Sequence, residues 1–90
     1  MRVHFTVVGW DHFLSWQSDV DTMRKIIQLI EDIRRSPFTG TGKPEPLKKP
    51  LSGCWPRRIN KEHRIVYRVS GKDDDQSVTI VYCRSHYGQS

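Results

Sequence analysis

The side chains that could catalyse a reaction gather in the second half of this 90-residue chain. Glu45 and Glu62 lie there among arginines, lysines and histidines, with Tyr87 close to the end. RNA is a substrate that such groups can cut, because its 2'-hydroxyl is an internal nucleophile. A base must remove the hydroxyl proton, an acid must protonate the leaving 5'-oxygen, and cations must stabilise the charged phosphorane. A carboxylate, a histidine and several cations can supply these roles without a metal.

Motifs for other kinds of chemistry are missing from the sequence. It contains no HExxH, no zinc-ribbon cysteine pairs, no GxGxxG and no P-loop. Cys54, Cys83 and His86 make a poor zinc set, because one C-x-x-H and a lone cysteine fall short of four ligands. We interpret both cysteines as small apolar residues with reduced thiols. We therefore expect no metal and no cofactor.

The positive charge is concentrated in one segment. The chain carries a net charge of +5, and residues 1–42 contribute equal numbers of basic and acidic side chains. A segment with this excess of cations indicates a polyanionic partner, because each phosphate contact releases condensed counterions. Between residues 43 and 70, Glu45 and Glu62 are outnumbered by Lys43, Lys48, Lys49, Arg57, Arg58, Lys61, Arg64 and Arg68. These cations could also simply solvate a sheet surface.

The first half predicts one strand and two helices. Alternating apolar residues predict a strand over residues 3–8 that ends at Gly9, followed by a short helix from Trp10. Ser18, with Asp21 three residues later, is typical of the start of a second helix. Its apolar stripe, spaced by three or four residues, ends before the helix breaker Pro37 and comprises Met23, Ile26, Ile27, Ile30 and Ile33. Trp10, Phe13 and Trp16 are expected in the core or on a dimer surface.

The second half predicts a long loop and three strands. Residues 36–56 hold all five prolines, and strands are expected near 55–60, 63–70 and 77–84, with a turn over 71–76. In the middle strand, Arg64, Val66 and Arg68 share one face, and we place the opposite face in the core. The facing of the last strand stays open, because both of its faces are largely apolar. This order predicts an α+β fold, with helices on one face of a mostly antiparallel sheet.

Four consecutive segments carry a resemblance to a known family. They lie at residues 42–48, 51–59, 62–67 and 84–87, and read GKPEPLK, LSGCWPRRI, EHRIVY and RSHY. In this order and spacing they resemble the motifs of YoeB-type toxins of the RelE superfamily. Cys54 stands where an aromatic residue is common, and Gly88, Gln89 and Ser90 extend beyond the usual end of the family. The resemblance implies a RelE-like fold for residues 1–90 as a single domain, with residues 88–90 as a flexible tail.

The resemblance also implies a role for individual residues. Glu45 matches the general base, His86 the general acid, and Arg64 the group that stabilises the phosphorane. Tyr87 matches an active-site aromatic residue and is an alternative proton donor. Positions that bind RNA or the transition state, or that orient its ligands, are Lys48, Arg58 and Glu62, and we count Lys43 and Lys49 with them. His63 could help to bind rRNA or mRNA, but we read it as a packing residue, and we read His4 and His12 as structural or surface residues.

The function that the resemblance implies is ribosome-dependent cleavage of mRNA in the A site of the small subunit. Implied partners are the mRNA, the ribosome, a YefM-type antitoxin, operator DNA through the antitoxin complex, and a second copy of the chain. No apolar stretch approaches a membrane span, and no signal peptide is visible, so we expect a cytoplasmic protein. The alternatives are a non-catalytic inhibitor with a RelE fold and a DNA-binding corepressor that acts with an antitoxin.

Overall fold

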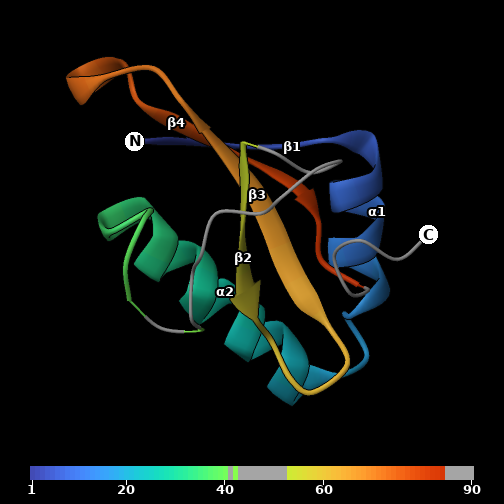
Figure 1. Ribbon diagram of the computed structural model, residues 1–90. Coiled ribbons are helices and arrows are strands. Elements are labelled where there is room, and N and C mark those ends of the chain that lie inside the picture. Colours follow the sequence, from blue (N-terminus) through green and yellow to red (C-terminus); the bar gives the residue numbers. More distant parts are fainter. Residues whose placement is uncertain (41, 43–52, 85–90) are drawn as a thin grey trace.

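Two helices and a four-stranded sheet form the fold. A computed structural model of the chain describes residues 1–40, 42 and 53–84 (Figure 1). The elements in chain order are β1 (Arg2–Phe5), α1 (Val7–Ser15), α2 (Val20–Arg35), β2 (Cys54–Arg58), β3 (Arg64–Ser70) and β4 (Ser77–Tyr82). A short 3₁₀ turn, Asp73–Asp75, joins β3 to β4 within the turn expected over residues 71–76. Neither described helix combines the length and apolar character needed to cross a membrane.

The strands lie in the order β1-β4-β3-β2. β2 pairs with β3 and β3 with β4, both antiparallel, which confirms the expected order of the last three strands. β1 joins the edge of β4 in the parallel direction, so the sheet is mixed. A parallel neighbour needs a long crossover connection. Here the chain between β1 and β4 includes both helices as well as β2 and β3 (Figure 1).

The expected first strand is too long by three residues. β1 ends at Phe5, and Thr6 caps the start of α1, where its Oγ1 accepts a hydrogen bond of 2.9 Å from the Gly9 backbone N–H. A Thr side chain at this position satisfies a backbone donor that a helix otherwise leaves free. Val7 and Val8 therefore begin a helix, and both are exposed. The apolar residues Val7 and Val8 extend the pattern of the strand in the sequence, but the cap at Thr6 ends the strand before them.

α2 confirms the expected long helix, with two corrections. Its cap is Asp19 rather than Ser18, because the Asp19 carboxylate accepts from the Thr22 backbone N–H at 3.1 Å. Its buried residues are Ile26, Leu29 and Ile33, whereas Ile27 is 47% exposed. At 100° per residue Ile27 is rotated about a quarter turn away from Ile26, which places it beside the buried stripe rather than within it. The helix ends at Arg35, before Pro37.

The apolar core lies between α2 and one face of the central strands. Ile65 and Tyr67 of β3 and Val78 and Ile80 of β4 are fully buried against it, which settles the facing of β4. Trp16, at the end of α1, completes the same cluster, whereas Trp10 of α1 is 46% exposed. A β-bulge shifts the register between β3 and β4: Tyr67 lies opposite Ile80, whereas Val66 lies opposite Tyr82. The residues of β4 after Ile80 therefore depart from simple alternation.

Candidate functional site

Three arginines gather on the face of β2 and β3 opposite to the apolar core. We call Arg58, Arg64 and Arg68 the arginine face. Because side chains alternate along a strand, Arg64 and Arg68 point away from Ile65 and Tyr67, which are buried in the core. The shared face predicted for Arg64 and Arg68 is therefore confirmed. Arg58 and Arg68 are exposed, and Arg64 is half-buried.

Arg58 lies directly opposite Arg64 in the ladder between β2 and β3. Side chains that face each other in this way start about 5 Å apart at Cβ, and like charges at this distance repel. Among the described residues no carboxylate forms an ion pair with Arg58, Arg64 or Arg68. The pair therefore provides positive charge that an anion such as a phosphate can neutralise.

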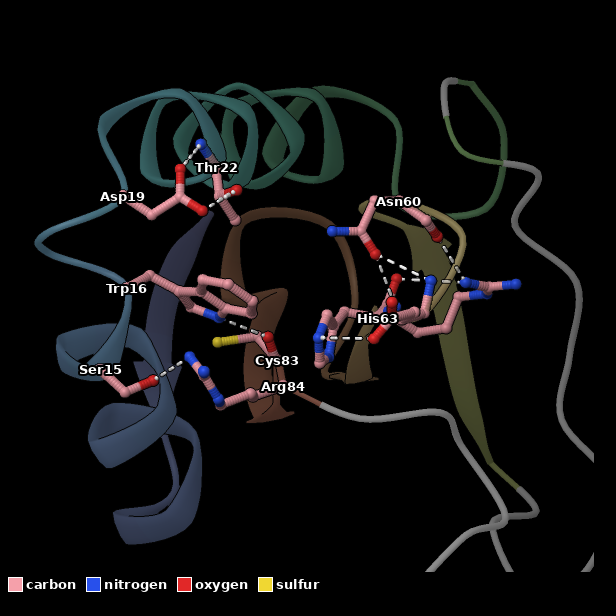
Figure 2. Close-up of polar contacts among 10 residues, drawn as sticks. Ser15, Trp16, Asp19, Thr22, Asn60, His63, Cys83 and Arg84 are labelled. Atoms are coloured by element: carbon pink, nitrogen blue, oxygen red, sulfur yellow. Dashed lines mark hydrogen bonds and ion pairs between the residues drawn. The ribbon is translucent and has the colours of Figure 1, made fainter.

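The Arg64 guanidinium is held by the turn that precedes β3. Its Nη1 donates to the backbone carbonyl oxygens of Asn60 and His63 at 2.8 and 3.1 Å. The turn is itself fixed by the Asn60 side chain, whose oxygen accepts from the backbone N–H groups of Glu62 and His63 at 2.9 and 2.8 Å (Figure 2). These contacts orient the cation without cancelling its charge, which suits a group that must meet a developing negative charge.

Two chain segments leave the described fold beside the arginine face. The backbone N–H of Arg58 donates to the carbonyl of Gly42 at 2.9 Å, immediately before residues 43–52. Tyr82, the last residue of β4, lies opposite Val66, which is two positions from Arg64 on β3. Both segments that contain the remaining site predictions therefore start from neighbours of the arginine face.

Six of the predicted site residues lie outside the described part of the chain. They are Lys43, Glu45, Lys48, Lys49, His86 and Tyr87, whose roles stay predictions. Glu62 is described, and its side chain is 84% exposed. Its carboxylate lies 3.9 Å from Nε2 of His63 and forms no ion pair with a described arginine. Of the predicted residues, the structure thus brings together Arg58 and Arg64.

Arg57 has a different place from the one that the charge pattern suggested. The charge pattern groups Arg57 with cations that could solvate the sheet, but its side chain is fully buried. It forms an ion pair with Asp32 of α2 and donates to the hydroxyl of Tyr67 at 3.0 Å. It also donates to the backbone carbonyls of Ser36 and Thr39, at 2.8 Å for the latter. Arg57 therefore attaches the segment after α2 to the sheet, just ahead of Gly42.

The sequence held a signal for this burial. Arg57 is two positions from Trp55 and from Ile59, so strand alternation places it on the core side. What the sequence did not provide was the partner, because Asp32 is 25 residues away. Tyr67 completes the arrangement by donating its hydroxyl to the carbonyl of Pro37. Burial raises the pKa of Tyr67, which keeps this hydroxyl protonated as a donor.

His12 of α1 holds the end of β4. Its Nδ1 accepts a hydrogen bond of 3.2 Å from the backbone N–H of Cys83, so this nitrogen must be unprotonated. Burial and, next in size, the nearby Arg84 charge lower the pKa of His12 below its ordinary value of 6.5. Asp11 acts in the opposite direction, and His63 adds to the lowering.

This environment predicts a loss of stability in acid. As the pH falls through 6.5, the unfolded chain gains a proton that folded His12 resists, so the contribution of His12 is full above 6.5 and decreases below it. We expect His12→Gln, which has no titrating group, to reduce the fall in unfolding free energy between about pH 7.5 and about pH 5.5. Urea unfolding of both proteins at the two pH values measures this. An equal fall in both would contradict the assignment.

The two cysteines do not provide a reactive thiol in the described fold. Cys54 and Cys83 are free and buried. Burial raises the pKa of the Cys83 thiol to about 12, and a neutral thiol is a poor nucleophile and metal ligand. Among the residues that the structure describes, no three His, Cys, Asp or Glu side chains are grouped as a metal site would require.

Comparison with known proteins places this geometry in a family. Residues 5–87 match the model for the YoeB-like toxin of bacterial type II toxin-antitoxin systems. Toxin YoeB of Escherichia coli K12 is 50% identical over 88 residues, which cover 97% of this chain and 100% of that protein. A YoeB/ParE toxin from Agrobacterium tumefaciens has a solved structure with a TM-score of 0.92 and 46% identity, covering 97% of this chain and 100% of that one.

Two similar solved structures from Staphylococcus aureus are of toxins in assemblies. A YoeB dimer and a YoeB-YefM complex each match with a TM-score of 0.82 and 36% identity, over 97% of this chain and 98% of the other. These likenesses confirm the α+β fold of the RelE-like type that the sequence motifs implied. The likeness extends over nearly the whole chain, including the strands that carry the arginine face. The chain therefore belongs to the YoeB-like family of toxins from bacterial type II toxin-antitoxin systems.

Proposed function

We propose that this toxin is an endoribonuclease that cuts mRNA in the ribosomal A site without a metal and so stops translation. The observation that supports it most is the pairing of Arg58 and Arg64 across two strands, with no carboxylate partner among the described residues. Such a pair can bind a phosphate in its ground state and stabilise the extra charge of the phosphorane. RNA supplies its own nucleophile, so the protein needs only to position groups and move protons.

The proton transfers are assigned to residues in the two flanking segments. Glu45 removes the proton of the 2'-hydroxyl, whose oxygen attacks the phosphorus while the bond to the 5'-oxygen breaks. His86 protonates that leaving oxygen, and the products carry a 2',3'-cyclic phosphate and a 5'-hydroxyl. Cations near the site favour an ionised Glu45 and oppose a protonated His86, so Tyr87 is the alternative donor.

Chain connectivity supports this grouping. Glu45 follows Gly42 by three residues, and a fully extended chain spans at most about 11 Å over that length. His86 follows Tyr82 by four residues, which sets a limit of about 14 Å. Gly42 is bonded to Arg58, and Tyr82 is paired with Val66. Chain length therefore allows the proposed base and the proposed acid to reach the arginine face.

The remaining roles follow from charge and from the relatives. Lys43, Lys48 and Lys49 are assigned to RNA phosphates, and Glu62 to the orientation of the arginines. A YefM-type antitoxin and a second copy of the chain are proposed as partners because the Staphylococcus aureus YoeB was solved as a dimer and in complex with YefM. Operator DNA is assigned to the antitoxin complex. A ribosomal substrate places the protein in the cytoplasm.

The proposed function is tested by primer extension on a defined mRNA in a purified bacterial translation system. We expect a cut in the A-site codon that requires ribosomes, and no cut when the nucleotide that attacks carries a 2'-deoxy sugar. Glu45→Ala is expected to abolish both the cut and growth arrest in cells. Intact mRNA with stalled translation, unchanged in Glu45→Ala, would instead identify an inhibitor that acts by binding alone.

A further inference from the structure

Side chains at the end of α1 hold the backbone where β4 ends. Cys83 follows the last residue of β4, and both of its backbone polar groups bond to side chains of the helical segment. Its N–H donates to Nδ1 of His12, and its carbonyl accepts from Nε1 of Trp16 at 2.9 Å. Figure 2 shows the indole of Trp16 directed at Cys83. The backbone at Cys83 is therefore fixed by these two hydrogen bonds, although strand pairing stops at Tyr82.

The next residue is held by the same segment. The guanidinium of Arg84 lies over the Trp16 ring, 4.1 Å from its centroid, and donates to the hydroxyl of Ser15 at 3.0 Å. A cation stacked on an indole and hydrogen-bonded at its edge has little freedom to rotate. Arg84 is two residues before His86, so these contacts determine where the chain begins its path to the proposed acid.

α1 provides a rigid base for these contacts because it lies very close to β4. A Cβ at Gly9 would come within 2.3 Å of the carbonyl oxygen of Ile80, a distance that real atoms do not reach. Thr6, at the cap of the helix, also donates to the carbonyl of Val81 at 2.7 Å. The start of α1 is thus fastened to the second half of β4, and its end to Cys83 and Arg84, which directly follow β4.

Trp16 also contacts the turn that holds Arg64. Its ring meets the His63 ring edge to face, with centroids 4.9 Å apart, and only 6% of Trp16 is exposed. The carbonyl of His63 is one of the two that accept from the Arg64 guanidinium. One buried indole therefore touches both the end of β4 and the turn that orients the proposed transition-state cation (Figure 2).

We propose that Trp16 is a positioning residue that sets the end of β4, and with it His86, relative to Arg64. This inference rests on the proposed nuclease function and assigns Trp16 no contact with RNA. Trp16→Phe removes the N–H that bonds to the carbonyl of Cys83 and keeps a smaller aromatic ring in the core. A displacement of about 1 Å between reacting groups can cost as much as a hundredfold in rate, so the loss of one such contact should slow the chemical step.

The test compares Trp16→Phe with Trp10→Phe, a matched control in the same helical segment. Trp10 packs on Phe5 and Phe13 and is 46% exposed, whereas the indole contacts with Cys83 and Arg84 are those of Trp16. We expect Trp16→Phe to lower kcat for ribosome-dependent cleavage by about tenfold, with KM within about twofold of wild type. Trp10→Phe should leave both values unchanged. An unchanged kcat in Trp16→Phe would overturn the inference.

A double-mutant cycle with His86→Ala separates positioning from a general loss of structure. If Trp16 acts through His86, Trp16→Phe should reduce the residual rate of His86→Ala by less than about twofold. The same tenfold reduction in both backgrounds would show that Trp16 acts independently of His86 and would reject the proposal.

Amide hydrogen exchange supplies a measure that does not depend on cleavage. We expect the exchange of the Cys83 N–H to accelerate about tenfold in Trp16→Phe and to stay unchanged in Trp10→Phe. An equal acceleration across all core amides, or none at Cys83, would contradict the role assigned to Trp16. If the wild type cuts no mRNA, the proposed function fails, and this exchange difference still decides whether Trp16 fixes the end of β4.

Discussion

Arg64→Ala is expected to lower the rate of ribosome-dependent mRNA cleavage by about 10²–10³-fold, the usual effect of removing one preorganised donor from a charged transition state. The Arg64 guanidinium is bonded only to backbone carbonyls among the described residues, so its charge is oriented and not neutralised. Its removal leaves Arg58 alone opposite the phosphate. Single-turnover cleavage in a purified translation system measures the rate of the chemical step.

Arg68→Ala is the matched control for this result. Arg68 lies on the same face of β3, four residues from Arg64, and its guanidinium contacts the thiol of Cys54 at 3.6 Å. Arg68→Ala removes the same charge as Arg64→Ala, and we expect it to lower the cleavage rate by less than about tenfold, through weaker phosphate binding. Arg64→Lys should recover only part of the lost rate, because an ammonium lacks the planar set of donors. Equal losses in Arg64→Ala and Arg68→Ala would mean that the face acts only by net charge.

Arg57→Met is expected to reduce the free energy of unfolding by about 3 kcal/mol, at the lower end of the range for breaking a buried ion pair. The change removes the cation that Arg57 supplies to the Asp32 carboxylate, and the donor that it supplies to the carbonyls of Ser36 and Thr39. Replacing a whole buried network with apolar residues can be neutral, but replacing one member leaves the others desolvated. Asp32 is 26% exposed and regains some hydration, which is why the lower end applies.

Urea unfolding of Arg57→Met and Arg35→Met tests this expectation. Arg35 is an exposed residue in the last turn of α2, and its substitution removes the same charge with a change of at most about 0.5 kcal/mol. A loss below about 1 kcal/mol in Arg57→Met would show that the buried contacts contribute little net stability. Without Arg57, the segment from Ser36 to Gly42 should also be held less firmly against β2.

Local patterns in the sequence determined several parts of this fold. The apolar repeat before Pro37 predicted α2, because a helix needs only local hydrogen bonds and one apolar stripe. Alternation in β3 separated Arg64 and Arg68 from the core residues Ile65 and Tyr67. The four ordered motifs identified the family, since their order and spacing together are specific even where each motif is weak. The resemblance assigns Arg58 and Arg64 to the site, and the pairing of β2 with β3 places the two residues opposite each other.

Other features depended on contacts between distant parts of the chain. Alternation in β4 left its facing open, and pairing with Tyr67 and Val69 of β3 placed Ile80 and Val78 in the core. The end of β1 was decided by Thr6, whose side chain caps α1 and also bonds to a carbonyl of β4. A periodic pattern assigns residues to faces but does not say how far a strand continues or which face is covered.

Arg57 and Trp16 show the same division most clearly. The charge pattern grouped Arg57 with surface cations, although strand alternation in β2 indicates the core side, and only the tertiary structure brought Asp32 within reach to make burial of that charge favourable. The sequence predicted Trp16 in the core or on a dimer surface, whereas its burial and its contacts with Cys83, Arg84 and His63 required the folded chain. Residue types and spacing determined which groups are available for chemistry. Long-range packing decided which of them meet, because the partners of a buried polar group lie far away in sequence.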